Sequence, residues 1–478
     1  MKSIERGPCF AMIGIAVLAM SAGCASVQRD AQFPAVKDSV SARIEQEITW
    51  RRDKVSDARA ADAVSKLLEK ELNADSAVQV ALLNNRGLQA KFEELGIAQA
   101  DLVDAGLLEN PVFGSSALFQ NAGTEISFDV MQDFLGVFTL SARKKIGNAG
   151  AQRATLSVGK SVVDLATDVQ GQYFRVIGDA QALALARQVI VATESAAELA
   201  QRQYAAGNLS KRELTLQRAF HAQTLLEVAQ AETQLEADRE KLNRLMGLWG
   251  KDTLWRMPER LPPIPAALPA LDDIERRAIE QRLDLAAAKK EAEGFAHALH
   301  LAHQYRWLSP LGIGVQYQRG SDGEKSYGPK LEFGLPLFNR GQTRIARLES
   351  ESRRAKEQVA ALAVDIRSEA REARGRLQAL HRAVKHYETS LLPLQKIIVG
   401  ETLKFYNGML IGVYDLLLAS QAQIQTGRQY IAASRDFWLS WTDLERALGA
   451  RQDRPAATPT TSDDSQTPAQ DAHPHGDQ

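Results

Sequence analysis

The sequence predicts a mainly α-helical protein with a small β part, in which one elongated unit is used twice. Residues 204–247 align with residues 406–449 at a constant offset of 202 and without a gap. Long stretches carry apolar residues at alternating steps of three and four, which is the spacing of coiled-coil helices. Two pairs of short segments alternate with a period of two, which is the spacing of β-strands. These patterns predict long antiparallel helices and one strand pair in each copy of the unit.

The N-terminus is predicted to be an export signal. Lys2 and Arg6 precede an apolar run of about 11 residues, which is too short to cross a bilayer of roughly 30 Å as a helix. The run ends in Ser-Ala-Gly-Cys, and small residues before a cysteine resemble the lipobox of bacterial lipoproteins. We expect removal of residues 1–23 and acylation of Cys24, with an ordinary secretory signal as the alternative. No later apolar stretch reaches ~18 residues, so no membrane-spanning helix is predicted in the mature chain.

The first repeat is expected at residues 76–257, after an N-terminal anchor and equatorial segment at 24–75. It begins with a shorter helix and continues with strands at 112–120 and 124–133. A long helix then covers residues 143–206 and ends in a hairpin tip at 204–213. The seam of this helix comprises Ala166, Val169, Tyr173, Val176, Ala180, Leu183, Arg187 and Ile190.

The second repeat is expected at residues 271–449, after a linker at 258–270 that contains five prolines. Its strands are predicted at 311–319 and 328–337 and its tip at 406–415. Pro393 lies inside the long helix and should kink it or force a local bulge, because proline cannot donate the helical hydrogen bond. The seam of this helix comprises Ile366, Ala370, Ala373, Leu377, Leu380, Val384, Tyr387, Leu391, Leu394, Ile398, Glu401 and Phe405. Residues 450–478 contain no Val, Ile, Leu or Met and are expected to be disordered.

Both tips are predicted to be tight turns followed by helix caps. Ser210 and Glu213 have the spacing of a capping box, and Gly412 and Asp415 repeat it. The tip residues are Tyr204, Gly207, Ser210 and Glu213 in the first copy and Tyr406, Gly408, Gly412 and Asp415 in the second. The first tip is polar and basic, whereas the second adds the apolar residues Met409, Leu410 and Ile411. An exposed apolar cluster at a turn usually marks a contact surface; packing against the neighbouring tip is the alternative.

Both strand pairs place apolar side chains on one face and glycine, glutamine or acidic residues on the other. Such alternation is typical of a membrane barrel wall around a water-filled lumen, and amphipathic hairpins on a soluble core are the alternative. Four strands cannot close a barrel, since the smallest kind has about eight, so the chain is expected to assemble with further copies. Glu125, Asp129 and Glu332 fall on the polar face and are expected to make the lumen acidic and cation-favouring.

Composition and motifs exclude several classes of function. The chain has 58 basic and 59 acidic residues and a net charge of −1, which does not support nucleic-acid binding. The two cysteines precede residue 25, and no Gly-x-Ser-x-Gly, His-Glu-x-x-His or Cys-x-x-Cys motif occurs, so neither an enzyme nor a cofactor is predicted. His297 and His300 have the spacing of half a metal site on a helix, although solvated or packed histidines are the simpler interpretation.

Between residues 76 and 450 the sequence resembles the TolC-type outer-membrane efflux proteins, in their acylated branch. The resemblance rests on the Tyr-x-x-Gly turn with its following acid at 204–213, on its second copy at 406–415, and on a junction sequence. That junction is Leu335-Pro336-Leu337-Phe338-Asn339-Arg340-Gly341. The resemblance implies a homotrimer whose protomers each give four strands to one outer-membrane barrel of a Gram-negative bacterium. The helices then continue the barrel as an α-helical tunnel through the periplasm.

The resemblance also implies partners and cargo. The tips would dock a periplasmic adaptor (membrane fusion) protein, an inner-membrane pump of the RND type would supply the energy, and Cys24 would anchor the chain to outer-membrane lipid. The cargo would be drugs, metal ions or other small solutes. A structural periplasmic coiled-coil lipoprotein, whose hairpins never enter the membrane, remains the alternative.

Overall fold

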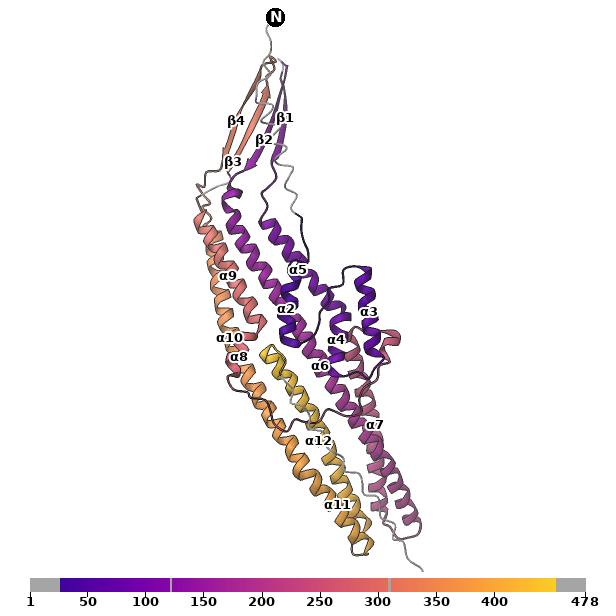
Figure 1. The fold of residues 1–478 in the computed structure, drawn as a ribbon. Coiled ribbons are helices and arrows are strands. Elements are labelled where there is room, and N and C mark those ends of the chain that lie inside the picture. The colour runs from indigo at the N-terminus through magenta and orange to yellow at the C-terminus, as the bar shows by residue number, and fades with distance from the viewer. Residues whose placement is uncertain (1–25, 121–122, 308–310, 453–478) are drawn as a thin grey trace, which may run out of the picture.

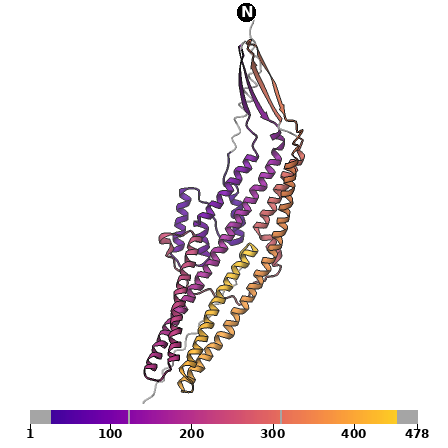
Figure 2. The same ribbon diagram turned by 180° about the vertical axis from the view of Figure 1, so that it is seen from behind.

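The computed structural model of the chain describes residues 26–120, 123–307 and 311–452. The expected signal peptide, Cys24 and most of the expected disordered tail lie outside the described residues. Within these ranges the molecule is a long rod, with a small sheet at one end and two helical hairpin tips at the other (Figure 1). The view from behind shows that both hairpins extend to the same end (Figure 2).

Most of the chain contains the same order of elements twice. The elements are α2 (Phe33–Ile44), α3 (Lys54–Leu68), α4 (Ala74–Asn84), α5 (Arg86–Ala105), β1 (Val112–Gln120), β2 (Gly123–Asp133), α6 (Leu135–Ala205), α7 (Lys211–Met246), η1 (Gly250–Thr253), α8 (Ile274–Gln281), α9 (Leu283–Gln304), β3 (Leu311–Arg319), β4 (Lys325–Phe333), α10 (Gln342–His386), η2 (Tyr387–Leu391), α11 (Leu392–Asn407) and α12 (Val413–Leu448). From α4 onward the repeated order is two helices, two strands and two long helices, the first of which is interrupted in the second copy. Mainly helical architecture with one small sheet agrees with the predicted fold class.

The two repeats share their breaks as well as their order. Helices α7 and α12 have 36 residues each and end at Gly247 and Gly449, both with a φ of +70°. Glycine adopts this left-handed conformation without steric cost and therefore ends both helices. Asn85 separates α4 from α5, and Arg282 separates α8 from α9, with the same extended backbone at a φ of −65°. The duplication seen in the sequence is thus visible in the backbone.

Helix α6 is 71 residues long, about 107 Å at ~1.5 Å per residue. It begins before residue 143, the predicted start, because the Asp133 carboxylate accepts hydrogen bonds from the backbone N–H groups of Leu135 (3.0 Å) and Gly136 (3.2 Å). Among the described residues, a window of α6 is long and apolar enough to cross a membrane by length and composition alone, although the sequence analysis expects no such helix. The chain itself buries 44% of that window, as is common for the core helix of a bundle.

The second long helix is interrupted as Pro393 predicts. Helix α10 passes at residues 387–391 into the π-helical turn η2 before α11 begins. In a π-turn the backbone hydrogen bonds reach one residue further than in an α-helix. The helix can therefore continue past a proline, which has no N–H group to donate. Above the turn the seam residue Leu377 is fully buried, whereas Leu394 and Phe405 below it are about half exposed. The chain therefore covers its own seam above the turn and leaves it open to solvent below.

The four described strands form one antiparallel sheet in the order β1-β2-β3-β4. Strands β2 and β3 join the hairpins of the two repeats, and β1 and β4 are the edges. The prediction of the fourth strand at 328–337 is wrong, because β4 covers Lys325–Phe333. Leu311, the first described residue of β3, pairs with Phe333, so the described ladder between β3 and β4 ends there.

The core has an aromatic part between α6, α10 and α12, and α2, α4, α5 and α8 add further buried apolar residues to it. Phe437, Trp438 and Trp441 of α12 cluster with Phe174 of α6, with neighbouring ring centroids 5.1–6.1 Å apart. The proline-rich linker crosses this core, where the Pro262 carbonyl accepts a hydrogen bond from the Trp438 indole N–H (3.0 Å). The linker therefore joins the repeats and also covers their shared core.

Three residues assigned to the disordered tail belong to the folded body instead. Ala450 and Gln452 are buried, and the Arg451 backbone N–H donates to the Arg43 carbonyl (2.7 Å). The Arg451 guanidinium pairs with Asp75 (3.0 Å). Polar composition is a poor guide here, because backbone and charged groups make these contacts.

Candidate functional site

The sheet has one apolar and one polar face, as the alternation predicts. Cross-strand pairing aligns each face over all four described strands. The apolar face carries Phe113, Phe128, Val130, Ile313, Val315, Tyr317, Tyr327 and Leu331. Neighbouring rings on it, such as Phe128 and Tyr317, lie 6.4 Å apart. Most of these side chains are exposed in the single chain, so the face is suited to an apolar environment.

Glu125, Asp129 and Glu332 all lie on the polar face, together with a lysine that the sequence analysis overlooked. Lys330 Nζ lies 3.3 Å from Asp129 Oδ2. Asp133 lies on the same face, because its pairing partner on β3 also pairs with Glu332. Four carboxylates and one ammonium group therefore leave three negative charges on this face of the described strands. Lys330 precedes Glu332 by two residues, so the period-two alternation contained the signal for it.

The first tip is a glycine turn followed by a capping box. Tyr204 is exposed in the last turn of α6, and Gly207 has a left-handed φ of +76°. The Ser210 backbone N–H donates to Glu213 Oε2 (3.0 Å), and the Glu213 backbone N–H donates to Ser210 Oγ (3.3 Å). Hydrogen bonds from the Ser210 side chain and backbone hold the pKa of Glu213 below its usual range.

The second tip has a similar cap but a different turn. Asp415 Oδ2 accepts a hydrogen bond from the Gly412 backbone N–H (3.2 Å). Gly408 lies in the turn, as predicted, but the left-handed conformation falls on the next residue: Gly408 has a φ of −76° and Met409 has a φ of +57°. Met409 aligns with Gly207 at the offset of 202. A non-glycine residue in this conformation costs about 1 kcal/mol, so the second tip is locally strained.

The two tips expose different chemistry at the same end of the rod. Met409 is 93% and Leu410 is 72% exposed, whereas Ile411 is partly buried. The first tip exposes Asn208 and Lys211 at its turn and cap. Because the chain's own first tip leaves Leu410 open, the apolar side chains of the second tip form a surface available for contact.

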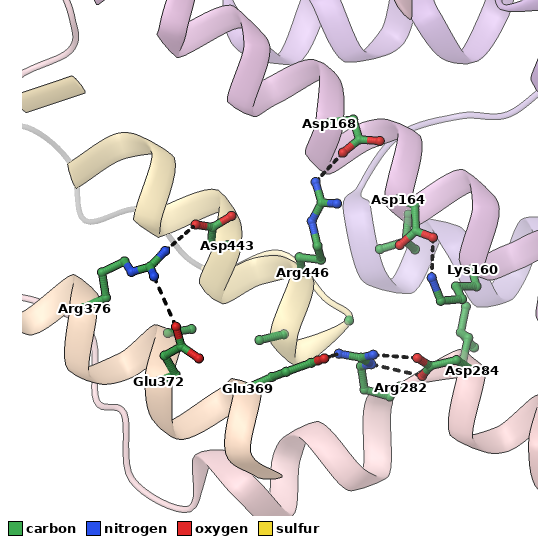
Figure 3. A pocket seen from close by; sticks show the side chains of 15 residues that line it. Lys160, Asp164, Asp168, Arg282, Asp284, Glu369, Glu372, Arg376, Asp443 and Arg446 are labelled. Atoms are coloured by element: carbon green, nitrogen blue, oxygen red, sulfur yellow. Dashed lines mark hydrogen bonds and ion pairs between the residues drawn. The ribbon is translucent and has the colours of Figure 1, made fainter. Parts of the chain in front are cut away.

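A charged crevice of about 480 Å³ lies between the two repeats (Figure 3). Its charged residues are Lys160, Asp164, Asp168, Arg282, Asp284, Glu369, Glu372, Arg376, Asp443 and Arg446. Arg282, at the break before α9, pairs with Asp284 and with Glu369 of α10 (2.7 Å). Arg446 of α12 reaches Asp168 of α6. Each cation in the crevice has an acidic partner, and the Arg446–Asp168 pair is the one of these ion pairs that joins the two repeats.

Two carboxyl groups are buried side by side below this crevice, Asp179 of α6 and Asp238 of α7. Asp238 is fully buried and accepts hydrogen bonds from Gln172 (2.9 Å) and Lys241 (2.9 Å). Burial raises the pKa of Asp179 to about 6, and its hydrogen bond to Asp238 adds to this, whereas Arg435 of α12 (3.3 Å) opposes it. Burial would raise the pKa of Asp238 as well, but its hydrogen bonds, led by that from Gln172, outweigh burial and hold the pKa low. Asp179 is therefore the member of the pair that takes the proton.

Among the described residues, His297 and His300 are not joined by a third side chain that could complete a metal site. His297 Nε2 lies 3.6 Å from Glu293 on the same helix, and His303 lies 3.7 Å from Glu349 of α10. The described ranges contain no group of three or more His, Cys, Asp and Glu side chains that could hold a metal ion. His300 therefore lies on α9 without a metal cluster among these residues.

Comparison with known proteins gives one sequence relative and several structures of the same fold. No protein-family model matches the sequence. The chain is 20% identical to the cobalt-zinc-cadmium resistance protein CzcC of Cupriavidus metallidurans over 391 residues, which are 79% of this chain and 90% of CzcC. The outer membrane protein VceC from Vibrio cholerae is similar with a TM-score of 0.65 at 17% identity, covering 82% of this chain and 97% of that one.

A third similar protein is the CmeC outer membrane channel from Campylobacter jejuni, with a TM-score of 0.67 at 14% identity, covering 87% of this chain and 91% of that one. The chain therefore has the fold of the TolC-type outer-membrane channels, and the resemblance inferred from the sequence is confirmed for the fold. Membership of the acylated branch stays a prediction, as does the assembly of several chains into a closed barrel.

Proposed function

We propose that the protein is the outer-membrane duct of an efflux system in a Gram-negative bacterium. The observation that carries this proposal is a two-faced sheet of four described strands with edges β1 and β4. An apolar outer face fits lipid and a polar inner face fits a wet lumen, while open edges require neighbours. A homotrimer supplies those neighbours and closes one barrel above a helical tunnel.

The duct works passively with two protein partners. The apolar second tip is the docking surface for a periplasmic adaptor, together with the first tip, and an inner-membrane pump of the RND type drives the transport. We assign no catalytic step to this chain. Its cargo is a small solute, either a drug or a metal ion, and the name of its relative CzcC, a cobalt-zinc-cadmium resistance protein, favours divalent metal ions.

Ion selectivity in planar bilayers tests the duct. Neutralising three of the acids of the polar face (Glu125→Gln, Asp129→Asn, Glu332→Gln) is expected to lower the permeability of cations relative to anions, because the lumen loses three negative charges. The opposite change, Lys330→Gln, removes the lysine that lies against Asp129 and is expected to raise cation preference. Reversal potentials in a salt gradient give both values. A wild-type protein that forms no conducting trimer contradicts the proposed duct, and unchanged selectivity in both variants contradicts the lumen assignment.

Lipid attachment at Cys24 adds an anchor to a barrel that already crosses the membrane. The variant Cys24→Ser is expected to lose all labelling by a fatty-acid probe, because the acylated sulfur is absent. Its barrel should still resist extraction by carbonate, as the wild-type barrel does. Labelling that persists in the variant contradicts the assignment of Cys24. Release of the wild-type protein by carbonate favours the alternative of a periplasmic spacer without a channel.

A further inference from the structure

Exposed aromatic side chains gather at the level where the strands give way to helices. Phe134 and Phe138 lie at the start of α6, Trp307 follows α9, and Phe338 lies between β4 and α10. The Tyr305 hydroxyl donates to the Phe138 carbonyl (3.1 Å), which holds the end of α9 against the start of α6. In membrane barrels such aromatic girdles mark the boundary between hydrocarbon and water. This level is therefore the boundary of the bilayer on the side of the helices.

Two arginine side chains lie over the ring of Trp307. The guanidinium carbon of Arg306 lies 4.6 Å from the centroid of the Trp307 ring, and that of Arg340 lies 5.1 Å from it. Both arginines are exposed, and among the described residues neither forms a salt bridge with a carboxylate. By contrast, Arg347 on α10 pairs with Glu351 four residues away (2.8 Å). The guanidinium groups of Arg306 and Arg340 thus lie over one indole ring, and within the described ranges neither forms a salt bridge.

We propose that Arg306, Trp307 and Arg340 bind the phosphate of an anionic phospholipid headgroup, in the leaflet that faces the helices. The proposal rests on the proposed function, since it requires the sheet to cross a membrane. A guanidinium group that stacks on an aromatic ring keeps its N–H edge free, and that edge matches two phosphate oxygens. The indole belongs at the headgroup level, where its apolar ring and polar N–H are both satisfied.

The surroundings of the cluster fit a lipid better than a free phosphate ion. Leu335 and Leu337, in the same junction as Arg340, are 69% and 64% exposed. Phe333 and Leu331 continue the apolar surface onto the sheet face that we assign to the bilayer. A headgroup held by the arginines therefore leaves its acyl chains along a continuous apolar surface.

A headgroup with a net negative charge is favoured because neither guanidinium group of the cluster has a salt-bridge partner among the described residues. Glu109 and Asp133, acids that line the pocket beside Arg306, are the groups that a choline or ethanolamine cation would approach.

Native mass spectrometry of the purified oligomer tests the site with dioleoylphosphatidylglycerol and dioleoylphosphatidylcholine as probes. The variant Arg306→Gln/Arg340→Gln is expected to bind the phosphatidylglycerol roughly 30-fold more weakly than the wild type, as two surface arginines are removed. The matched control is Arg353→Gln/Arg354→Gln, which removes two exposed arginines lower on α10 and changes the net charge equally. The control is expected to bind as the wild type does.

Three results overturn the proposal: unchanged binding in the double variant, equal binding of both lipids by the wild type, and displacement of the lipid by millimolar inorganic phosphate. The last result assigns the cluster to free phosphate. Bilayer conductance of the same samples separates this proposal from the duct itself, since a variant that conducts normally but loses the lipid supports the site. If the double variant does not assemble, Arg340→Gln alone, which leaves Arg306 on the ring, is measured against Arg354→Gln, and equal affinities overturn the proposal.

Discussion

Exchange of Leu410 for aspartate is expected to abolish export, while the amount of assembled protein in the membrane stays at the wild-type level. Leu410 lies at the second tip, 72% exposed, beside the strained turn at Met409. A charge placed there cannot be buried against an apolar partner surface without a large desolvation cost. Gly412 and Asp415 keep the turn and its cap, so the helix start remains intact. Complementation of a deletion strain and crosslinking to the adaptor measure the loss.

The first tip supplies the matched control for this experiment. Asn208 occupies the position equivalent to Leu410 at the offset of 202, so Asn208→Asp adds the same charge to the polar tip. That variant is expected to retain most of the export, because its neighbourhood is already solvated. Loss of the oligomer itself in Leu410→Asp contradicts docking and identifies the apolar tip as a packing surface between neighbouring copies.

Replacement of Asp238 by asparagine is expected to destabilise the helical body by about 3 kcal/mol at neutral pH. The fully buried carboxylate accepts hydrogen bonds from Gln172 and Lys241 at Oδ1 and from Gln234 at Oδ2. An amide group has only one acceptor oxygen and would turn a donor toward the donors at one of these two positions. The Lys241 ammonium also loses the negative charge that lies 2.9 Å away. Thermal unfolding followed by circular dichroism in detergent measures the change.

The neighbouring variant Asp179→Asn separates a loss of charge from a loss of shape. The folded protein favours the neutral form of Asp179, so its contribution to stability is complete below pH 3.8 and is lost as the pH rises through about 6. That interval corresponds to about 3 kcal/mol. Asp179→Asn imitates the protonated acid and is expected to match the wild type only below pH 3.8 and to exceed its stability at pH 8. A variant that is as stable as the wild type under both conditions contradicts the assignment of the proton to Asp179.

Local signals in the sequence predicted most of the architecture. The steps of three and four in the seams, the alternation of the strands and the spacing of Ser210 and Glu213 each involve residues close in the chain. The bulge before Pro393 was predictable for the same reason, since the missing N–H acts within one helical turn. The end of β4 could not be predicted in this way. It depends on pairing with β3, a separate strand, on which Leu311 is the described partner of Phe333.

The features that the sequence did not reveal depend on residues far apart in the chain. Asp179 and Asp238 lie on different helices, and their polar side chains look like ordinary surface residues until the fold buries them. Arg282 and Glu369 meet only because α9 packs on α10. The strained residue of the second tip could not be foreseen for another reason: glycine adopts the left-handed conformation more readily, yet Met409 and not the neighbouring Gly408 adopts it.

The π-helical turn gives the second hairpin a pivot, and the length of α11 makes it a lever. From Leu391 to Met409 the chain extends about 27 Å along the helix axis at ~1.5 Å per residue. Each degree of bending at the pivot therefore moves the second tip by about 0.5 Å, and ten degrees move it by about 5 Å. The 71-residue α6 has no such turn, so displacing the first tip requires curvature spread over a continuous helix. The two halves of the duplicated chain are thus mechanically unequal, and the apolar tip is on the more compliant arm.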